Sequence, residues 1–201
     1  MNLVELIRNQ LDDNTVEELQ HEIGAESKEQ TEAAANAVIS TLVAGLNKNV
    51  ERPGGAEELV SAIDRDHDGS LLEDLAGNLF GKRKVANPRA TNGLGILDHI
   101  LGGRQEQVND GLGRATGLQK NQILNLMIRL APMVLAMLGR MRNRQGLGTE
   151  QISDLLRGTV QAQRTQRKET GLLERLLDSN DDGGVMDDLA NLGRNVFTRR
   201  G

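Results

Sequence analysis

Apolar and polar residues recur along most of the chain with the three-to-four-residue period of an amphipathic helix. The most apolar stretch runs from residue 124 to 138 and carries Leu, Ile, Met and Val. Glycines such as Gly24 and Gly117 follow apolar runs, where a helix can end in a left-handed conformation. We therefore expect an all-α protein, a multi-helix bundle. The pattern predicts helices over residues 2–12, 15–23, 28–47, 56–63, 70–80, 95–101, 105–116, 119–143, 150–157, 171–177 and 184–197.

Local signals sharpen some of these helices. The pairs Asn14 with Glu17 and Ser27 with Gln30 have the spacing of a capping box, in which two side chains bond the free backbone N–H groups of a helix start. Pro132 lies inside the longest predicted helix. Because proline removes a backbone donor and crowds the preceding turn, we expect a kink or break there.

One pattern occurs twice in the chain. Residues 64–76 and 178–190 share the spacing of Asp, Gly and a closing Asp-Leu-Ala, and a basic cluster follows each copy. Upstream, a leucine lies five residues before Gly24, and another lies five residues before Gly117. In both places a polar helix start and a long apolar helix follow. Recurrence in the same order predicts two diverged helical repeats.

The repeats suggest a domain organisation. Residues 1–81 form the first repeat, residues 82–92 a charged linker, and residues 93–201 the second repeat. A polar stretch near residues 159–170 has no Leu, Ile or Met and no counterpart in the first repeat. We expect this stretch to be a mobile insertion or a solvated helix.

Charge is divided between the two parts. Residues 1–81 hold 5 Lys and Arg against 17 Asp and Glu, whereas residues 82–201 hold 19 against 12. The net charges are thus -12 and +7, which together give the overall -5. Fields of opposite sign should attract, so we expect the acidic part to contact the basic part of the same or another molecule.

Composition excludes several classes of site and suggests a location. The chain has no Cys, so disulfides, thiolate nucleophiles and cysteine-ligated metals are excluded. The first residues lack the basic start and long apolar run of a secretory signal, which makes the cytoplasm the expected location. The apolar stretch 124–138 is interrupted by polar residues and is too short to cross a bilayer, so it is interpreted as a core helix.

Four strings resemble a known bacterial family. They are residues 66–70 (Asp-His-Asp-Gly-Ser), 95–103 (Gly-Ile-Leu-Asp-His-Ile-Leu-Gly-Gly), 115–118 (Ala-Thr-Gly-Leu) and 130–133 (Leu-Ala-Pro-Met). The chain is similar over most of its length to the domain-of-unknown-function family numbered 937, to which YidB-like helical proteins are related. The resemblance implies a small helical bacterial protein without an assigned activity. The many arginines of the second half depart from the usual pattern of that family.

The repeated Asp-rich segment has part of a calcium-loop pattern. Side chains at positions 1, 3 and 5 of such a loop converge on the ion, and glycine at position 6 permits a sharp turn. Gly69 and Gly183 hold position 6, but position 12, which needs a bidentate Glu, holds Leu75 and Leu189. Any calcium site here should therefore be weak. The candidate ligands are Asp64, Asp66, Asp68, Asp178, Asn180 and Asp182.

A capping turn explains the same residues without a metal. Ser70 and Glu73 have capping-box spacing, and carboxylates near a helix start are stabilised by its partial positive charge. We favour this reading over calcium binding. The histidines, His21, His67 and His99, are not spaced as a metal-binding pair, and no convergent acid, base and nucleophile can be identified.

Two further groups admit alternatives. The methionines at 127, 133, 137 and 141 could line an adaptable groove but are more typical of a core. Basic residues of the second half could bind phosphates, although there are no interleaved aromatic residues for base stacking. That basic set is Arg140, Arg142, Arg144, Arg164, Arg167 and Lys168.

The function we expect is that of a non-enzymatic scaffold or protein-interaction module without a cofactor, with a protein or a second copy as its partner. A weak calcium-binding regulatory module is the first alternative. Nucleic-acid binding by the basic half is the second.

Overall fold

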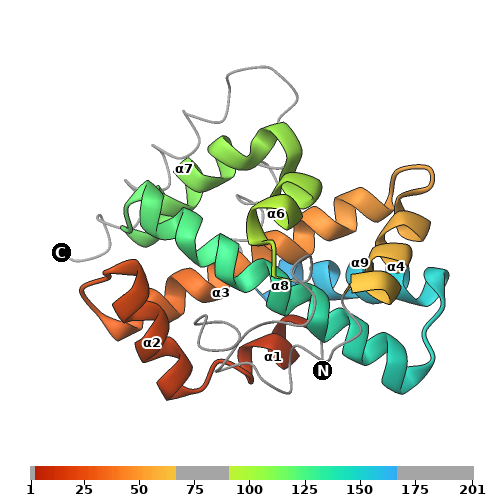
Figure 1. Cartoon of the computed structure of the whole chain (residues 1–201), viewed down its shortest axis with the longest axis horizontal. Helices are drawn as coiled ribbons and strands as arrows, with labels where there is room; N and C mark the ends of the chain where they lie inside the picture. Colours follow the sequence, from red (N-terminus) through yellow and green to blue (C-terminus); the bar gives the residue numbers. More distant parts are fainter. Residues whose placement is uncertain (1–2, 67–90, 167–201) are drawn as a thin grey trace.

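The computed structural model describes residues 3–66 and 91–166, and every regular element in these ranges is a helix (Figure 1). The predicted all-α class is confirmed. The predicted helices 70–80, 171–177 and 184–197 lie outside the described residues, as does nearly all of the predicted linker 82–92.

Four helices form the described part of the first half. The second begins one residue after Asp12, whose carboxylate accepts a hydrogen bond from the backbone N–H of Thr15 at 2.8 Å. The capping box predicted at Asn14 is therefore wrong, while Ser27 caps the third helix as predicted. The first helix ends at Arg8, earlier than predicted. The helices are α1 (Leu3–Arg8), α2 (Asp13–Ile23), α3 (Lys28–Val50) and α4 (Gly55–Asp66).

The described part of the second half repeats this order of short, medium, long and medium helices. Asn92 caps the first of them by accepting a hydrogen bond from the backbone N–H of Gly95. Gly24 and Gly117 end α2 and α7 with positive φ angles of 66° and 76°, as predicted for both. The elements are α6 (Gly93–Leu101), the 3₁₀ turn η2 (Gly102–Arg104), α7 (Gln105–Thr116), α8 (Lys120–Gln145) and α9 (Thr149–Gln166).

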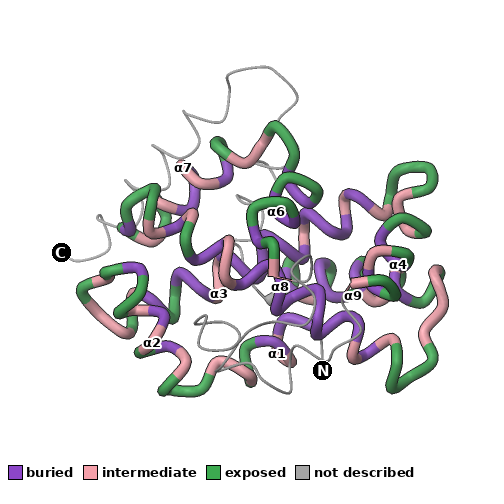
Figure 2. Tube along the Cα trace, in the orientation of Figure 1, coloured by how far each residue is buried: buried purple, intermediate pink, exposed green. Residues whose placement is uncertain are grey.

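Both halves contribute to one hydrophobic core. The long helices α3 and α8 pack against each other at the centre, and the other helices surround them (Figure 1). Buried residues follow the inner faces of α3, α8 and α9, whereas α2 and α7 expose their outer faces (Figure 2). Ile39, Leu42, Leu130 and Leu138 are fully buried in this single cluster. Each such side chain contributes about 1.5–3 kcal/mol to folding through burial.

The central helix α8 is continuous through Pro132, so no break occurs at the proline. Its methionines at positions 127, 133, 137 and 141 are all buried, which confirms their prediction as core residues. Among the described residues, α8 is the one helix long and apolar enough to cross a membrane. However, 72% of its most apolar window is buried inside the protein, as expected for a core helix.

The end of α9 corrects a sequence expectation. The helix was predicted to stop at residue 157, but it continues to Gln166 and packs along α3. Thr159, Val160 and Gln163 are buried, and the Gln163 side-chain amide donates to Ser40 Oγ at 3.2 Å. The described part of the polar stretch 159–170 is therefore a helix with a buried face, and neither a mobile insertion nor a solvated helix. The pattern of apolar residues did not predict this part of α9, because several of its buried residues are polar.

Two glycines permit close approach between helices, Gly93 within the second half and Gly45 between the halves. A Cβ atom on Gly93 would lie 2.0 Å from the backbone oxygen of Ile128, so the start of α6 packs directly on the α8 backbone. A Cβ atom on Gly45 would lie 2.7 Å from Ile100 Cγ2, where α3 crosses α6. Real Cβ atoms do not come this close, so both positions require glycine or a local rearrangement.

The packing pattern is nearly reciprocal between the halves. The first helix of each half contacts the long helix of the other, because α1 packs on α8 and α6 packs on α3. The second helices do the same, α2 on α8 and α7 on α3. Within each half, a lysine at the start of the long helix pairs with an acid of the preceding helix. Lys28 lies 3.0 Å from Glu17, and Lys120 lies 2.6 Å from Asp110.

Two glutamines extend this reciprocity across the halves. Gln30, in the first turn of α3, donates its side-chain amide to the Thr116 carbonyl at the end of α7, at 3.1 Å. Gln122, in the first turn of α8, donates to the Gly24 carbonyl at the end of α2, at 2.7 Å. Each amide thus satisfies a carbonyl that has no partner within its own helix. We call this pair the glutamine caps.

Candidate functional site

The structure describes two of the six candidate calcium ligands. Asp64 and Asp66 lie in the last turn of α4, whereas Asp68, Asp178, Asn180 and Asp182 lie outside the described residues. Asp66 pairs with the neighbouring Arg65 at 2.8 Å. Calcium binding by this set stays a prediction.

Asp64 already has a cationic partner in the other half of the chain. Arg142 of α8 donates from Nε to Oδ1 at 2.6 Å and from Nη2 to Oδ2 at 2.8 Å, a two-point pairing. The hydrogen bonds from Arg142 lower the pKa of Asp64 below its ordinary value, and the same contact raises the pKa of Arg142. A cation at Asp64 would have to displace this arginine.

The other predicted candidates are spread over several elements. His21 is exposed at the end of α2, His99 is exposed on α6, and His67 lies outside the described residues. In residues 3–66 and 91–166, no three Asp, Glu or His side chains are grouped so that they could hold a metal ion. Among the basic residues, Arg140, Arg142 and Arg144 lie near the end of α8 and Arg164 near the end of α9. Arg167 and Lys168 lie outside the described range.

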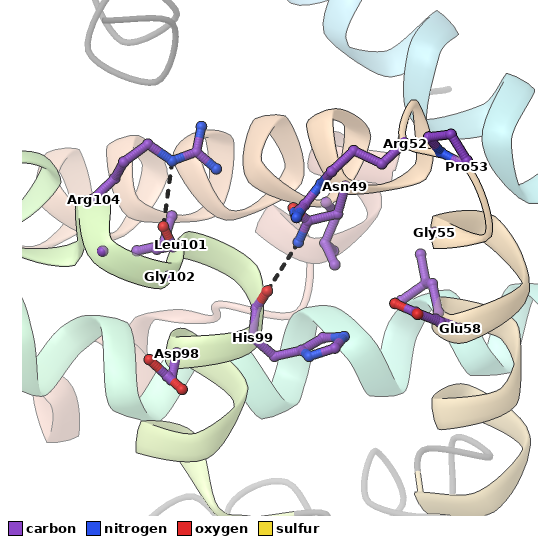
Figure 3. Close-up of a pocket in the computed structure, with 13 residues that line it drawn as sticks. Asn49, Arg52, Pro53, Gly55, Glu58, Asp98, His99, Leu101, Gly102 and Arg104 are labelled. Atoms are coloured by element: carbon purple, nitrogen blue, oxygen red, sulfur yellow. Dashed lines mark hydrogen bonds between the residues drawn. The ribbon is translucent and has the colours of Figure 1, made fainter. Parts of the chain in front are cut away.

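A pocket of about 530 Å³ lies where the two halves meet, and we call it the interhelix pocket (Figure 3). The end of α3, the turn after it and the first turns of α4 form one side, while the end of α6 and η2 form the other. Close packing fixes one wall, because a Cβ atom on Gly55 would lie 2.0 Å from the Asn49 backbone oxygen. The polar and charged residues that line it are Asn49, Arg52, Glu58, Asp98, His99 and Arg104.

Asn49 organises the floor of the interhelix pocket. The residue is 9% exposed, and its side-chain amide donates to the carbonyls of His99 at 3.0 Å and Ile100 at 3.1 Å near the end of α6 (Figure 3). Its Oδ1 atom accepts a hydrogen bond from Arg52 Nη2. A buried amide therefore ties α3 to α6 and at the same time holds an arginine at the pocket.

Two guanidinium groups, two carboxylates and one imidazole line the pocket, the carboxylates being those of Glu58 and Asp98. Arg104 Nε donates to the Leu101 carbonyl at 3.3 Å, which places its guanidinium on the same side of the pocket as that of Arg52 (Figure 3). Across the pocket, the His99 ring and the Glu58 carboxylate extend toward each other from α6 and α4 (Figure 3). The pocket can therefore offer donors on one side and an acceptor on another.

Sequence reasoning singled out His99, but it missed Asn49, Arg52, Glu58 and Arg104. Asn49, Arg52 and Glu58 lie in one short segment and Arg104 in another, far away in the chain, and no spacing motif joins the two segments. A weak signal exists in retrospect, because each arginine adjoins a pair of glycines or a Pro-Gly-Gly turn. Only the crossing of α3 with α6 brings them together.

Comparison with protein families identifies the family of this chain. The family model for bacterial proteins of unknown function, DUF937, matches residues 5–141. The chain belongs to this family. In this DUF937 protein the match runs from α1 into α8 and so includes every helix that lines the interhelix pocket. No match was found among curated proteins or among solved structures.

Proposed function

We propose that this DUF937 protein is a non-enzymatic helical scaffold, located in the cytoplasm, that self-associates through the opposite charges of its two halves. The observation that carries the proposal is the placement of charge. In Figure 1, α2 lies at one end of the longest axis, while the C-terminal end of α8 lies toward the other end. A head-to-tail contact between such ends is heterologous and would form chains or rings of molecules.

One of these ends is acidic. Seven acidic residues on or beside α2 and in the first turns of α3 are exposed, and only part of their charge is neutralised, because Lys28 pairs with Asp13 and Glu17 and Arg129 pairs with Glu22. We call this surface the acidic end. It consists of Asp12, Asp13, Glu17, Glu22, Glu26, Glu29 and Glu32.

The opposite surface is basic. Arg140, Arg142 and Arg144 lie at the end of α8, where Arg144 is exposed and the other two are partly buried. We call these three residues the basic end. Contacts of the same kind already join the two halves, because Arg129 pairs with Glu22 at 2.8 Å and Arg142 pairs with Asp64. These pairs support the proposal that arginines of the second half recognise carboxylates of the first.

The scaffold is proposed to consist of two diverged copies of one four-helix unit. The repeated order of helix lengths, the two left-handed glycine ends and the glutamine caps support this interpretation. An unrelated pair of segments would have no reason to exchange equivalent bonds at equivalent turns. If the unit was duplicated and the charges of the two copies then diverged, one molecule would carry both an acidic and a basic interaction surface.

Light scattering of the full chain across a salt series tests self-association. The Debye length falls from about 30 Å at 0.01 M to about 3 Å at 1 M ionic strength, so a charge-driven contact must weaken over this range. We expect the apparent mass to decrease toward the monomer as salt rises. A mass that stays monomeric throughout would overturn the proposal.

Charge-reversed variants make the test specific. Glu26→Lys with Glu29→Lys should abolish association at low salt, and so should Arg140→Glu with Arg144→Glu. Mixing the two variants should restore association, because the altered ends are complementary to each other. As a matched control, Glu106→Lys changes an exposed charge on α7, outside both ends, and should leave the mass unchanged. Failure of the mixture to associate would contradict the head-to-tail contact.

A further inference from the structure

We propose that the interhelix pocket binds a small organic anion, with a carboxylate or phosphate group held by Arg52 and Arg104. The inference goes beyond self-association, because the pocket includes neither the acidic end nor the basic end. A volume of about 530 Å³ is in the range of small-molecule sites.

The guanidinium of Arg52 is held in place but keeps most of its donors. Arginine has five N–H donors in a planar fork, a geometry that matches the oxygens of carboxylate and phosphate. The one hydrogen bond of the Arg52 side chain within the described residues is the bond to Asn49. Asn49 is itself fixed by the two carbonyls of α6. An arginine positioned by a buried amide loses little conformational entropy when it binds an anion.

Arg104 adds a second positive charge on the same side of the pocket (Figure 3). Its bond to the Leu101 carbonyl fixes the side chain near the end of α6. Two guanidinium groups that face one space can contact different oxygens of a single anionic group. This arrangement favours an oxyanion over a cation at this side.

Glu58 and His99 define the other end of the ligand. The carboxylate of Glu58 can only accept hydrogen bonds when ionised, and the exposed imidazole of His99 can donate or accept. A ligand that spans the pocket should therefore carry an oxyanion at one end and a hydroxyl or ammonium donor at the other.

The backbone beside Arg104 is open to a ligand. A Cβ atom on Gly103 would meet no atom within 4 Å, and its φ is not in the left-handed region. Neither packing nor backbone conformation therefore requires glycine at this position. The missing side chain leaves the peptide at the pocket wall accessible.

Amide chemical shifts of the full chain, titrated with inorganic phosphate and separately with succinate, test the proposal. Sodium chloride at matched ionic strength serves as the reference. We expect saturable shifts at Gly55, Gly102 and Gly103, with a Kd of about 1 mM or tighter. A response to phosphate alone would assign a phosphate ligand, and a response to succinate alone a carboxylate ligand. Shifts that do not saturate, or that centre on the basic end, would overturn the proposal.

Three variants make the assignment specific. Arg52→Gln and Arg104→Gln should each weaken binding by about tenfold, the loss expected for one charge-assisted hydrogen bond. Gly103→Asp should abolish binding by placing a negative charge in the open space, without a packing clash. Arg144→Gln at the basic end is the matched control and should bind as the wild type does. Undiminished binding by a correctly folded Gly103→Asp variant would show that the anion binds elsewhere.

Discussion

The central helices of the two halves fill one core with different side chains. α3 buries small and polar residues, including Ala34, Ala35, Ser40 and Thr41, whereas every buried residue of α8 is apolar or glycine. The hydroxyl groups of Ser40 and Thr41 donate to carbonyls one turn earlier in α3, so their burial leaves no free donor. The comparison shows how two similarly placed helices become complementary: α3 contributes small side chains, and α8 contributes large ones.

This difference determines where the halves can touch. Because the side chains of α3 are small at these positions, α6 can cross it at Gly45, and the side-chain amide of Gln163 in α9 can reach Ser40. By contrast, α8 supplies more large apolar side chains to the core than any other described helix, including Met127 and Leu130. A large residue in α3 would therefore disturb the packing, whereas a small residue in α8 would leave a cavity.

The largest expected effect comes from truncating a core leucine in either central helix. Leu42→Ala in α3 and Leu130→Ala in α8 should each lower the free energy of unfolding by about 2–5 kcal/mol, because both side chains are fully buried. Since the halves share one core, each variant should shift a single cooperative transition in thermal or denaturant unfolding.

The control for this prediction is Leu94→Ala, because Leu94 is 55% exposed. It should change the free energy of unfolding by about 0.5 kcal/mol or less. Two separate transitions, with each core variant shifting only its own, would contradict a shared core.

A smaller loss in the free energy of unfolding is expected where α6 approaches α8. Gly93→Ala would place a methyl group against the Ile128 carbonyl and should destabilise the protein by about 1–3 kcal/mol. Gly158→Ala in α9 is the matched control, because a Cβ atom there meets nothing within 4 Å. That variant should be neutral or stabilise the protein by up to about 1 kcal/mol. Equal stability of the two variants in chemical denaturation would mean that α6 can shift away from α8 without loss.

The sequence could predict the features that depend on local periodicity. Apolar spacing identified each described helix, and the glycines at 24 and 117 correctly located two helix ends. Polar burial was not predictable, because Thr159 and Gln163 look like surface residues until Ser40 of α3 is placed beside them. Helix starts were ambiguous wherever several capping residues occur together, as at Asp12 and Asn14.

The candidate site was less predictable than the fold. The Asp-rich pattern concerned residues next to one another in the chain, so a motif could suggest it. The interhelix pocket depends on a contact between Asn49 and the end of α6, 50 residues away in sequence from the His99 carbonyl that it binds. Neither composition nor spacing encodes such a contact. The glutamine caps were missed for the same reason, since Gln30 looked like half of a local capping box.

The glutamine caps provide a test of equivalence between the halves. Gln30→Ala and Gln122→Ala should each lower the free energy of unfolding by about 1 kcal/mol, because each leaves a helix-end carbonyl without its donor. Gln161→Ala, an exposed glutamine of α9, is the matched control and should have little effect. A marked loss for one cap and none for the other, measured by urea denaturation, would show that the two bonds are not equivalent.

The smallest expected effect concerns the ion pair that joins Asp64 in the acidic half with Arg142 in the basic half. Asp64 is 50% exposed, so solvent screens the pair, and Asp64→Asn should lower the free energy of unfolding at pH 7 by about 0.5 kcal/mol or less. Because the pKa of Asp64 is lowered in the folded state, its stabilising contribution is present above the ordinary aspartate pKa of about 4. That contribution should disappear as the pH falls through the lower, folded-state pKa. Unfolding measured from pH 7 to below pH about 3 should therefore show wild type and Asp64→Asn converging in acid. Asp98→Asn, which removes an exposed carboxylate on α6, is the matched control at pH 7 and should change the free energy of unfolding by about 0.5 kcal/mol or less. If the difference in free energy of unfolding between wild type and Asp64→Asn grows as the pH falls, its pH dependence has the opposite sign. The ion pair would then not be the source of that difference.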